Sequence, residues 1–305
     1  MIGVWDKGGI MMNNWKDEFP QENRYFETDN GILYNVDVVK GLKRFSDESI
    51  DLVVTSPPYD NLRYYSAKNE KDLQNIWSFE KFKIIAKELY RIMTKGGVVV
   101  WVVGNATIKG SETGNSFRQA LYFKDECGFK LHDTMIYDKG NCPFPEVNRY
   151  YQCFEYMFVL SKGKPKTVNL IRDRRNKQAG KSVLSSTNRL LDGNLVECSA
   201  KRKGIDRKIK KFGVRFNIWK ISPGWKKSHT DDIAYKHPAT FPEQLAYDHI
   251  ISWSNEGDIV LDPLCGSGTT LKMAKKSNRK WVGIELNPEY CEIVKKRILK
   301  EENLL

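Results

Sequence analysis

The sequence predicts an α/β fold built on a doubly wound, mainly parallel β-sheet. Short apolar runs rich in valine and isoleucine alternate with segments of helical periodicity along most of the 305 residues. Two of these runs, 50–54 and 98–103, are apolar along nearly their whole length, which is typical of strands buried on both faces. Turns rich in glycine or proline follow several runs, and sheets of this kind bind ligands where their strands end.

The first half of the chain is expected to begin with an arm and then enter the core. Residues 1–31 show little periodicity and are assigned to this arm. A strand at 32–35 precedes a helix that starts near Asp37, and the strand at 50–54 follows. The remaining elements of this half are a loop at 60–77, a helix capped by Ser78 and ended by Gly96 and Gly97, a strand at 98–103, a helix at 115–126, and strands at 134–137 and 156–160.

The alternation of strands and helices resumes after a long basic segment. A helix that starts at Pro242 presents apolar side chains on one face as far as Trp253. The last elements are a strand at 258–262, the turn Gly266-Ser267-Gly268 with a helix after it, a strand at 280–285, and a helix that starts at Asn287 and Pro288, with Tyr290, Ile293, Val294 and Ile298 on its buried side.

The composition is that of a globular protein, with 40% hydrophobic and 12% aromatic residues. The six cysteines form no CxxC pair, and the four histidines show no spacing typical of metal ligands. We therefore expect a reduced protein without a metal site. No apolar run reaches the length of a signal peptide or of a membrane span, so we expect a cytoplasmic protein without membrane contact.

The positive charge of the chain is concentrated in one segment. Residues 162–227 contain 20 Lys and Arg but only 4 Asp and Glu, a net charge of +16 against +12 for the whole chain. A basic segment on an otherwise acidic body predicts a polyanionic partner, although a single charged run is often only a solvated surface. The aromatic residues interleaved with these charges favour contact with nucleic acid, and they are Phe212, Phe216, Trp219 and Trp225.

A rigid corner follows the strand at 50–54, in the sequence Thr55-Ser56-Pro57-Pro58-Tyr59. Neither proline can donate a hydrogen bond to a neighbouring strand, so the strand must stop here. The corner would present the Ser56 hydroxyl and free carbonyl groups to an exocyclic amine, while the ring of Tyr59 stacks on a planar base. The alternative is an ordinary turn that only ends a strand.

The segment 258–285 has the features of half a dinucleotide-binding unit. Gly266 and Gly268 let a ligand approach the backbone, and Glu285, 17 positions after Gly268, can accept hydrogen bonds from ribose hydroxyls. The third glycine of the dinucleotide fingerprint is absent near Leu271, which disfavours NAD. An adenosyl ligand with an amino-acid end fits better, and Asp262 would then pair with its ammonium group.

These segments together resemble the S-adenosylmethionine-dependent DNA amino-methyltransferases of the beta class. In that class the catalytic half comes first, the target-recognition region follows, and the cofactor half comes last. The matching blocks, which occur in the order of the family, are YNVDVVKGL (34–42), TSPPY (55–59), NCPFPEVNRYYQCFEYMFVLSKGK (141–164), HPATFPEQL (237–245), LDPLCGSGTT (261–270, with Leu264 where the family usually has Phe) and GIELNPEY (283–290).

The resemblance implies a seven-stranded, Rossmann-like sheet in permuted order. It divides the chain into a catalytic half at 1–161, a basic target-recognition insert at 162–235 and a cofactor-binding half at 236–305. The implied cofactor is S-adenosylmethionine, and the implied catalytic residues are Ser56, Pro57, Pro58 and Tyr59. The implied cofactor-binding residues are Asp37, His237, Phe241, Pro242, Asp262, Pro263, Cys265, Gly266, Gly268, Thr269 and Glu285.

The reaction that the resemblance implies is methylation of an exocyclic amine in a flipped-out DNA base. In the family, Ser at the position of Ser56 is associated with N4 of cytosine, and Asp or Asn with N6 of adenine, so N4-cytosine is favoured and N6-adenine is the alternative. Methylation at C5 of cytosine needs a cysteine nucleophile, and Cys142 lacks the sequence context of that family. An inactive nucleic-acid-binding protein, or an RNA or protein methyltransferase, are the other classes consistent with the sequence.

Double-stranded DNA is the expected partner, in a bacterial, archaeal or phage-infected cell. A cognate restriction endonuclease is a further expected partner, and the chain is expected to act as a monomer or homodimer. The predicted DNA-binding residues are Arg63, Arg149, Tyr150, Lys201, Arg202 and Lys203. For Arg63, Arg149 and Tyr150, a role in internal packing or ion pairing is an equal alternative.

Overall fold

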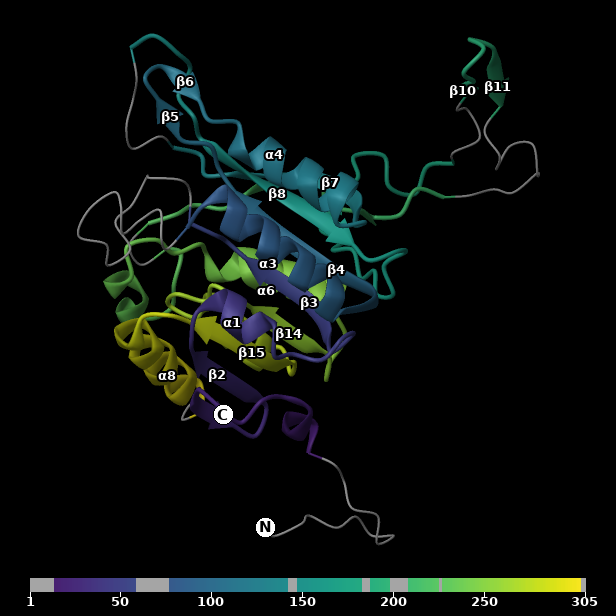
Figure 1. The fold of residues 1–305 in the computed structure, drawn as a ribbon. Coiled ribbons are helices and arrows are strands. Elements are labelled where there is room, and N and C mark those ends of the chain that lie inside the picture. Colours follow the sequence, from purple (N-terminus) through teal and green to yellow (C-terminus); the bar gives the residue numbers. More distant parts are fainter. Residues whose placement is uncertain are drawn as a thin grey trace, which may run out of the picture. The chain divides into compact units, whose positions relative to one another are not determined.

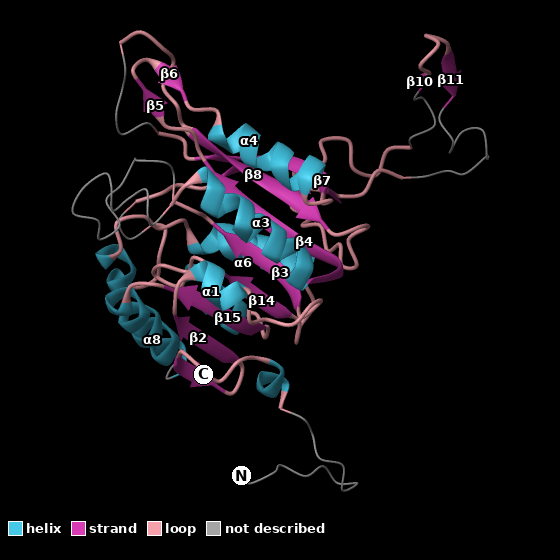
Figure 2. Ribbon diagram, viewed as in Figure 1, coloured by secondary structure: helices cyan, strands magenta, loops and turns pink. Residues whose placement is uncertain are grey.

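A nine-stranded sheet forms the centre of the fold in the computed structural model, which describes residues 14–58, 77–141, 147–182, 187–197, 208–224 and 227–302 (Figures 1 and 2). Five neighbouring strands run parallel, and an antiparallel strand then separates them from a second parallel pair. In order across the sheet, the strands are β1 (Arg24–Thr28), β2 (Gly31–Asn35), β15 (Lys280–Glu285), β14 (Ile259–Asp262), β3 (Ile50–Thr55), β4 (Met93–Val103), β8 (Phe154–Ser161), β7 (Lys130–Asp138) and β13 (Ile218–Lys220).

The doubly wound, mainly parallel sheet predicted from the sequence is therefore confirmed, and β1 and β13 extend it beyond the seven predicted strands. The prediction missed β1 because it is an antiparallel edge strand whose residues alternate only between half-buried and exposed. Next to it, Gly31 lies directly against the indole ring of Trp281, and a β-carbon at this position would overlap the ring. This contact brings β2 and β15 together at the sheet edge.

Helices cover both faces of the sheet and enclose two apolar clusters (Figure 2). One face carries α1 (Val38–Leu42), α3 (Phe79–Ile92) and α4 (Asn115–Leu121) with a π-helical turn at Tyr122–Glu126, and the other face carries α6 (Glu243–Trp253), α7 (Thr269–Lys276) and α8 (Pro288–Glu302). Leu42, Phe82 and Phe123 are fully buried on the first face, and Leu245, Leu271 and Val294 on the second. Two 3₁₀-helical turns lie at Trp15–Glu18 and Asp232–Lys236.

The end of α3 differs from the prediction. The helix ends at Ile92, because Met93 has extended backbone angles and already pairs with Ile50 in the sheet. Gly96 and Gly97 therefore lie inside β4 and do not cap the helix. Gly96 has a φ of +78°, and its N–H and C=O bond to Lys162 and Lys166 in the segment that follows β8.

Residues 170–217 form a separate compact unit. This unit contains the short antiparallel pairs β9 (Arg174–Arg175) with β12 (Phe212–Gly213) and β10 (Thr187–Arg189) with β11 (Leu195–Glu197). The Arg174 guanidinium lies 4.6 Å from the ring centroid of Phe216, and Arg215 Nε donates to Asp173 over 2.9 Å. With 14 Lys and Arg against 4 Asp and Glu, the unit carries a net charge of +10.

The boundaries of this unit are narrower than the predicted insert at 162–235, because residues on both sides of it belong to the main unit. Trp219 shows why. It lies in β13, pairs with Tyr137 of β7, is 6% exposed and stacks on His249 with 4.5 Å between ring centroids. The expectation that Trp219 contacts nucleic acid is therefore wrong, since this ring packs against the sheet. Trp225 lies outside the described residues.

None of the helices in the described ranges is both long enough and apolar enough to cross a membrane.

Candidate functional site

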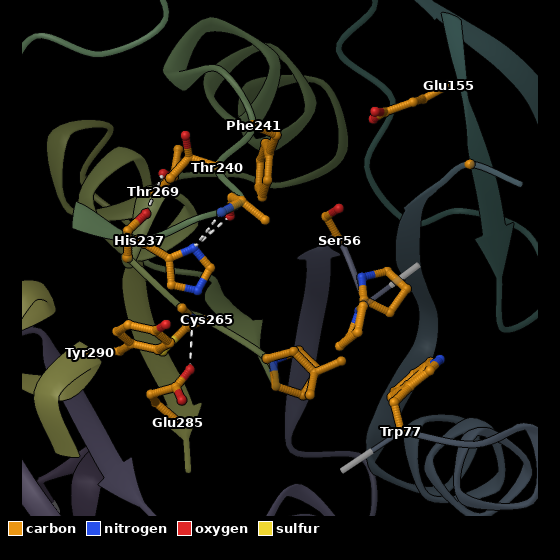
Figure 3. A pocket seen from close by; sticks show the side chains of 18 of the residues that line it. Ser56, Trp77, Glu155, His237, Thr240, Phe241, Cys265, Thr269, Glu285 and Tyr290 are labelled. Carbon is orange, nitrogen blue, oxygen red and sulfur yellow. Dashed lines mark hydrogen bonds between the residues drawn. The ribbon is translucent and has the colours of Figure 1, made fainter. Parts of the chain in front are cut away.

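A cavity of about 1290 Å³ opens along one edge of the sheet (Figure 3). Its walls come from the segments that follow the carboxyl ends of β2, β15, β14, β3, β4 and β7, and from the start of the antiparallel β8. The carboxyl ends of parallel strands meet at one edge of a sheet. Because β8 runs in the opposite direction, its first residues lie at this same edge. Among them, β3 occupies the middle of the sheet, so Ser56 lies between the two halves of the cavity.

The proline corner follows β3 directly. Ser56 and Pro58 are half-buried, Pro57 is buried, and all three line the cavity. Ser56 shares the strand face of Leu52 and Val54, and its side chain projects into the open space between Phe241 and Glu155 (Figure 3). Tyr59 and Arg63 lie outside the described residues, so their predicted roles stay predictions.

Hydrogen bonds tie the proline corner to the neighbouring strand β14. Thr55 Oγ1 donates to Asp262 Oδ1 over 2.7 Å, and Thr270 Oγ1 donates to the carbonyl of Val54 over 2.9 Å. The backbone N–H of Leu264 donates to the same Asp262 oxygen over 3.2 Å. These bonds hold the proline corner against the predicted cofactor loop, although the two segments lie about two hundred positions apart in the chain.

Asp262 thus occupies a different place from the one expected of a ligand-binding carboxylate. Its side chain is 1% exposed and does not line the cavity. Burial raises its pKa to about 6, against the hydrogen bonds from Thr55 and Leu264 that favour the charged form. In this structure Asp262 joins the ends of β3 and β14, and its pairing with a ligand ammonium stays a prediction.

The glycine turn after β14 adopts backbone angles that favour glycine. Gly266 has a φ of +49° and Gly268 a φ of +75°. A β-carbon on Gly266 would lie 2.8 Å from Nε2 of His237, so the imidazole ring covers the turn closely. His237 is held by a 2.7 Å hydrogen bond between Nδ1 and the carbonyl of Ala239, and by an edge contact with the ring of Tyr290.

Glu285 closes this part of the site from the end of β15. Its two carboxylate oxygens accept hydrogen bonds from the N–H groups of Gly266 over 2.9 Å and Asn287 over 2.8 Å (Figure 3). Burial raises the pKa of Glu285 to about 7, although these hydrogen bonds lower it. The carboxyl group faces the cavity and can still accept hydrogen bonds from a ligand hydroxyl.

Asp37 lines the cavity at the end of β2. Its side chain caps α1 by accepting hydrogen bonds from Val39 and Lys40, and it forms a 2.8 Å ion pair with Lys81 of α3. Burial acts to raise the pKa of Asp37, but the Lys81 contact and the backbone hydrogen bonds outweigh it and hold the pKa below its ordinary value. The residue is therefore a fixed negative charge at the cavity wall.

A buried ion network supports the glycine turn from the side opposite the cavity. Arg297 of α8 pairs with Asp231 over 3.0 Å and with Glu243 over 2.8 Å, and Lys272 of α7 pairs with the same two carboxylates. The guanidinium of Arg297 also donates to the carbonyl of Ser267 over 2.7 Å. The network thereby anchors the middle residue of the glycine turn to three helices.

The structure brings most of the predicted residues to one cavity. Those that line it are Asp37, Ser56, Pro57, Pro58, Tyr150, His237, Phe241, Pro263, Cys265, Gly266, Thr269 and Glu285. Four described residues of the predicted set do not line it: Arg149, Asp262, Gly268, whose backbone starts α7, and Pro242, which precedes the first residue of α6. Lys201, Arg202 and Lys203 lie outside the described residues.

Arg149 and Tyr150 have different surroundings although they are neighbours. Arg149 donates to the carbonyl of Gly110 over 2.9 Å and to Thr107 Oγ1 over 3.3 Å, so it braces the hairpin of β5 (Thr107–Ile108) and β6 (Ser111–Glu112). Tyr150 is fully exposed and lines the cavity. Arg149 therefore makes internal hydrogen bonds, and its contact with DNA stays a prediction.

Several cavity residues were missed: five lie outside the blocks that match the family, and Glu155 and Tyr290 lie inside such blocks but were given no role in the site. The missed residues are Trp77, Lys81, Asn105, Tyr137, Lys139, Glu155 and Tyr290. Asn105 and Lys139 follow strands that the sequence predicted, so their position after a strand end was the available signal. Tyr290 was expected on the buried side of its helix, but it is half-buried and packs edge-on against His237.

Comparisons with known proteins agree with this geometry. Residues 50–296 match the DNA methylase family that groups N6 and N4 methyltransferases. The chain is 57% identical over 257 residues to the orphan methyltransferase M.BamHII of Bacillus amyloliquefaciens. The aligned region covers 84% of this chain and 91% of that protein.

Two solved structures share the fold. The PvuII DNA methyltransferase, described as cytosine-N4-specific, superposes with a TM-score of 0.63 at 24% identity, covering 91% of this chain and 89% of its own. M1.HpyAVI, solved as a complex with SAM, superposes with a TM-score of 0.54 at 21% identity, covering 87% and 98%.

Proposed function

Since this chain belongs to the DNA methylase family of N6 and N4 amino-methyltransferases, we propose that it methylates the N4 amine of a cytosine that has left the DNA duplex. The observation that carries the proposal is the shared cavity: the Ser56 corner and the Gly266–Glu285 turn line one space, and β3 and β14 are direct neighbours. The cofactor is S-adenosylmethionine. The base assignment is supported by the serine at position 56 and by the cytosine-N4 specificity in the name of the PvuII enzyme.

The described residues fit this cofactor. Glu285 offers carboxylate oxygens for ribose hydroxyls, the Gly266 turn has no side chain in the way, and Phe241 and His237 add apolar and aromatic surface. The cavity of 1290 Å³ exceeds the roughly 300–1,000 Å³ of a typical small-molecule site, so it has room for a cofactor and a base together. When bound, S-adenosylmethionine supplies a methyl group on a positively charged sulfur, which is open to attack by a nitrogen lone pair.

The protein must then make an exocyclic amine into a better nucleophile. The lone pair of such an amine is delocalised into the base ring, and acceptors for its two N–H bonds help to localise the pair on nitrogen. We assign this task to Ser56 Oγ and to the carbonyl of Pro57, with Tyr59 stacking on the ring. As the N–C bond forms, the bond between the methyl group and the sulfur would break, and the positive charge would pass from the sulfur to the amine, whose proton then leaves to solvent. The residues of the corner act by positioning and electrostatics.

Double-stranded DNA is the proposed substrate, and a base must leave the duplex to reach a cavity of this kind. The compact unit at 170–217, with its net charge of +10, is proposed as the target-recognition region within the basic insert. We further propose action in the cytoplasm, as a monomer or homodimer, beside a restriction endonuclease of the same specificity.

The proposal is tested by sequencing DNA from cells that express the wild-type chain or the Ser56→Ala variant, with base-resolved detection of methylation. N4-methylcytosine in one sequence context, present with wild type and lost with the variant, is the expected result. N6-methyladenine instead would overturn the base assignment. Absence of any methylated amine, together with no heat on titration with S-adenosylmethionine, would favour an inactive nucleic-acid-binding protein.

Binding of S-adenosylmethionine is expected to strengthen as the pH rises from about 5 to 7, by at most about tenfold per pH unit. In the free protein the raised pKa of Glu285, about 7, keeps its carboxyl protonated below that pH, whereas ribose hydroxyls that donate to it favour the charged form. Binding therefore releases a proton. The same raised pKa stabilises the unliganded fold at acidic pH, and this contribution is lost as the pH rises from 4.5 through about 7.

Titration calorimetry in two buffers of different ionisation enthalpy measures both the affinity and the proton release. The Glu285→Gln variant is the control, because its amide does not titrate, and its affinity should be flat over this range. If the affinity of the wild type depends on pH as little as that of the variant, Glu285 does not bind the ribose hydroxyls.

Replacement of Lys201, Arg202 and Lys203 by glutamine is expected to flatten the salt dependence of DNA affinity. Each phosphate contact that is lost lowers the slope of log K against log salt concentration by about 0.9. The control replaces Lys87, Lys124 and Lys130, three exposed lysines on the main unit, with glutamine. Equal slopes for the two triple variants would show that residues 201–203 do not contact DNA phosphates.

A further inference from the structure

A polar wall made of Tyr137, Lys139 and Glu155 lines the cavity on the side of β7 and β8. Tyr137 of β7 is the direct register partner of Glu155 of β8, and the Nζ of Lys139 donates to Glu155 Oε1 over 3.2 Å. Glu155 lies across the cavity from the cofactor-side residues, with Ser56 between them (Figure 3).

The sheet places this wall at a definite spacing from Ser56. Side chains alternate along strands, so Ser56 shares the face of Val54, and Glu155 shares the face of Met157, and both belong to the same side of the sheet. Strand β4 lies between β3 and β8, and Gly104, which follows β4, lies opposite Glu155 and has no side chain to fill the gap. Ser56 lies opposite Val102, so two strand spacings across the sheet and two residues along it separate the backbones of Ser56 and Glu155, roughly 12 Å in all. Side chains from both sides line this gap, where a pyrimidine with hydrogen bonds at both ends of one edge can bind.

The wall offers hydrogen-bond donors. Tyr137 is 2% exposed, and its hydroxyl has no hydrogen-bond partner among the residues that the structure describes. Buried hydroxyls without a partner are uncommon in folded proteins, so a ligand is a natural source of the missing acceptor. Lys139 has three N–H donors, and the bond to Glu155 uses only one of them. Glu155 thus fixes the ammonium group while leaving donors for a ligand.

We propose that Tyr137, Lys139 and Glu155 form the subsite that reads the ring edge of the extruded base, and that this subsite selects cytosine over adenine. The inference rests on the proposed function, because it takes the exocyclic amine to lie at Ser56. Cytosine then presents its N3 and O2 acceptors along the same edge as the amine, with O2 at the far end of that edge, and Lys139 and Tyr137 supply donors to them. Adenine has a C–H group in place of O2, so it would leave a buried donor unpaired, and sites built around such a hydrogen bond reject ligands that lack it.

The test measures methyl transfer to a short duplex that carries the sequence context found by sequencing. Its target position holds either cytosine or a cytosine analogue that lacks O2. Lys139→Met should lower kcat/KM for the cytosine duplex by about 10- to 100-fold, as expected for the loss of a hydrogen bond to a charged donor. The affinity for S-adenosylmethionine should stay the same. The matched control is Lys130→Met, an exposed lysine at the opposite end of the same strand, and it should behave as wild type.

The analogue separates recognition from structural damage. Wild type should prefer cytosine to the analogue, and Lys139→Met should methylate both at similar rates. Tyr137→Phe, which removes only an oxygen atom and leaves the packing in place, should also reduce this preference. If both variants keep the wild-type preference, while Ser56→Ala is inactive, the subsite is wrong and the proposed function stands. If wild type methylates N6 of adenine, cytosine selection is overturned. If wild type methylates no amine, the proposed function itself fails.

Discussion

Ser56→Ala is expected to slow methyl transfer by about 10²–10³-fold, the usual effect of removing one preorganised polar group from the reacting atoms. The affinity for S-adenosylmethionine should be nearly unchanged, because Ser56 follows β3 on the proposed base side of the cavity, whereas the Gly266 turn follows β14 and Glu285 ends β15, farther along the sheet. The substitution removes one oxygen atom from a half-buried position and leaves the proline corner intact.

Single-turnover transfer of a labelled methyl group and calorimetric titration of the cofactor measure the two quantities separately. Ser46→Ala is a suitable control, since Ser46 is an exposed serine outside the cavity of the same unit. Loss of rate and of cofactor affinity in equal proportion would contradict the assignment of Ser56 to the base.

Arg297→Met is expected to lower the free energy of unfolding by about 3–5 kcal/mol, because breaking a buried ion pair leaves uncompensated charges in the interior. Arg297 is 1% exposed, and it pairs with Asp231 and Glu243, which are 5% and 7% exposed. Lys272 remains, but this one lysine, which also pairs with Glu301, must then compensate Asp231 and Glu243 as well. Burial opposes the charge on Glu243, yet the hydrogen bonds and cations around it hold its pKa far below the ordinary value.

The same substitution should weaken cofactor binding, since Arg297 also holds the carbonyl of Ser267 within the glycine turn. Denaturant unfolding and cofactor titration of the folded variant measure the two effects. Lys296→Met is the matched control: Lys296 is the neighbouring residue on α8, its side chain is more than half exposed, and its pair with Glu292 is a surface contact worth at most about 1 kcal/mol. Equal stability of the two variants would show that the buried network does not support the fold.

Much of the architecture could be predicted from local patterns. The buried strands 50–54 and 98–103, the helix capped by Ser78 and the glycine turn at 266–268 all appear where periodicity and turn residues placed them. The failures involve nonlocal contacts. Gly96 and Gly97 looked like a helix end, but pairing of Met93 with Ile50 starts the strand earlier. Trp219 looked like a nucleic-acid contact because of its basic neighbours, and its packing on His249 depends on a strand that joins the far edge of the sheet.

In the candidate site, too, residues in local motifs could be predicted and residues brought together by nonlocal contacts could not. Motifs predicted Ser56, Gly266 and Glu285, since each depends on a short run of residues with a special turn or strand end. Tyr137 and Lys139 lie outside the blocks that match the family, and Glu155 has no predicted role within its block. The three residues become neighbours only because β7 and β8 pair in one register. Asp262 was expected to face a ligand, and its contact with Thr55 could not be foreseen, because it joins two strands from opposite ends of the chain.

The sequence by itself determined the class of fold, the family and the positions of the two turns to which the chemistry is assigned, because turns and buried strands depend on neighbouring residues. Only the tertiary structure decided that these turns share one cavity. The reason is the strand order of the sheet, which places β3 beside β14 and so brings Ser56 to the cofactor turn. That order results from burial and hydrogen bonding between distant segments, which no local pattern encodes.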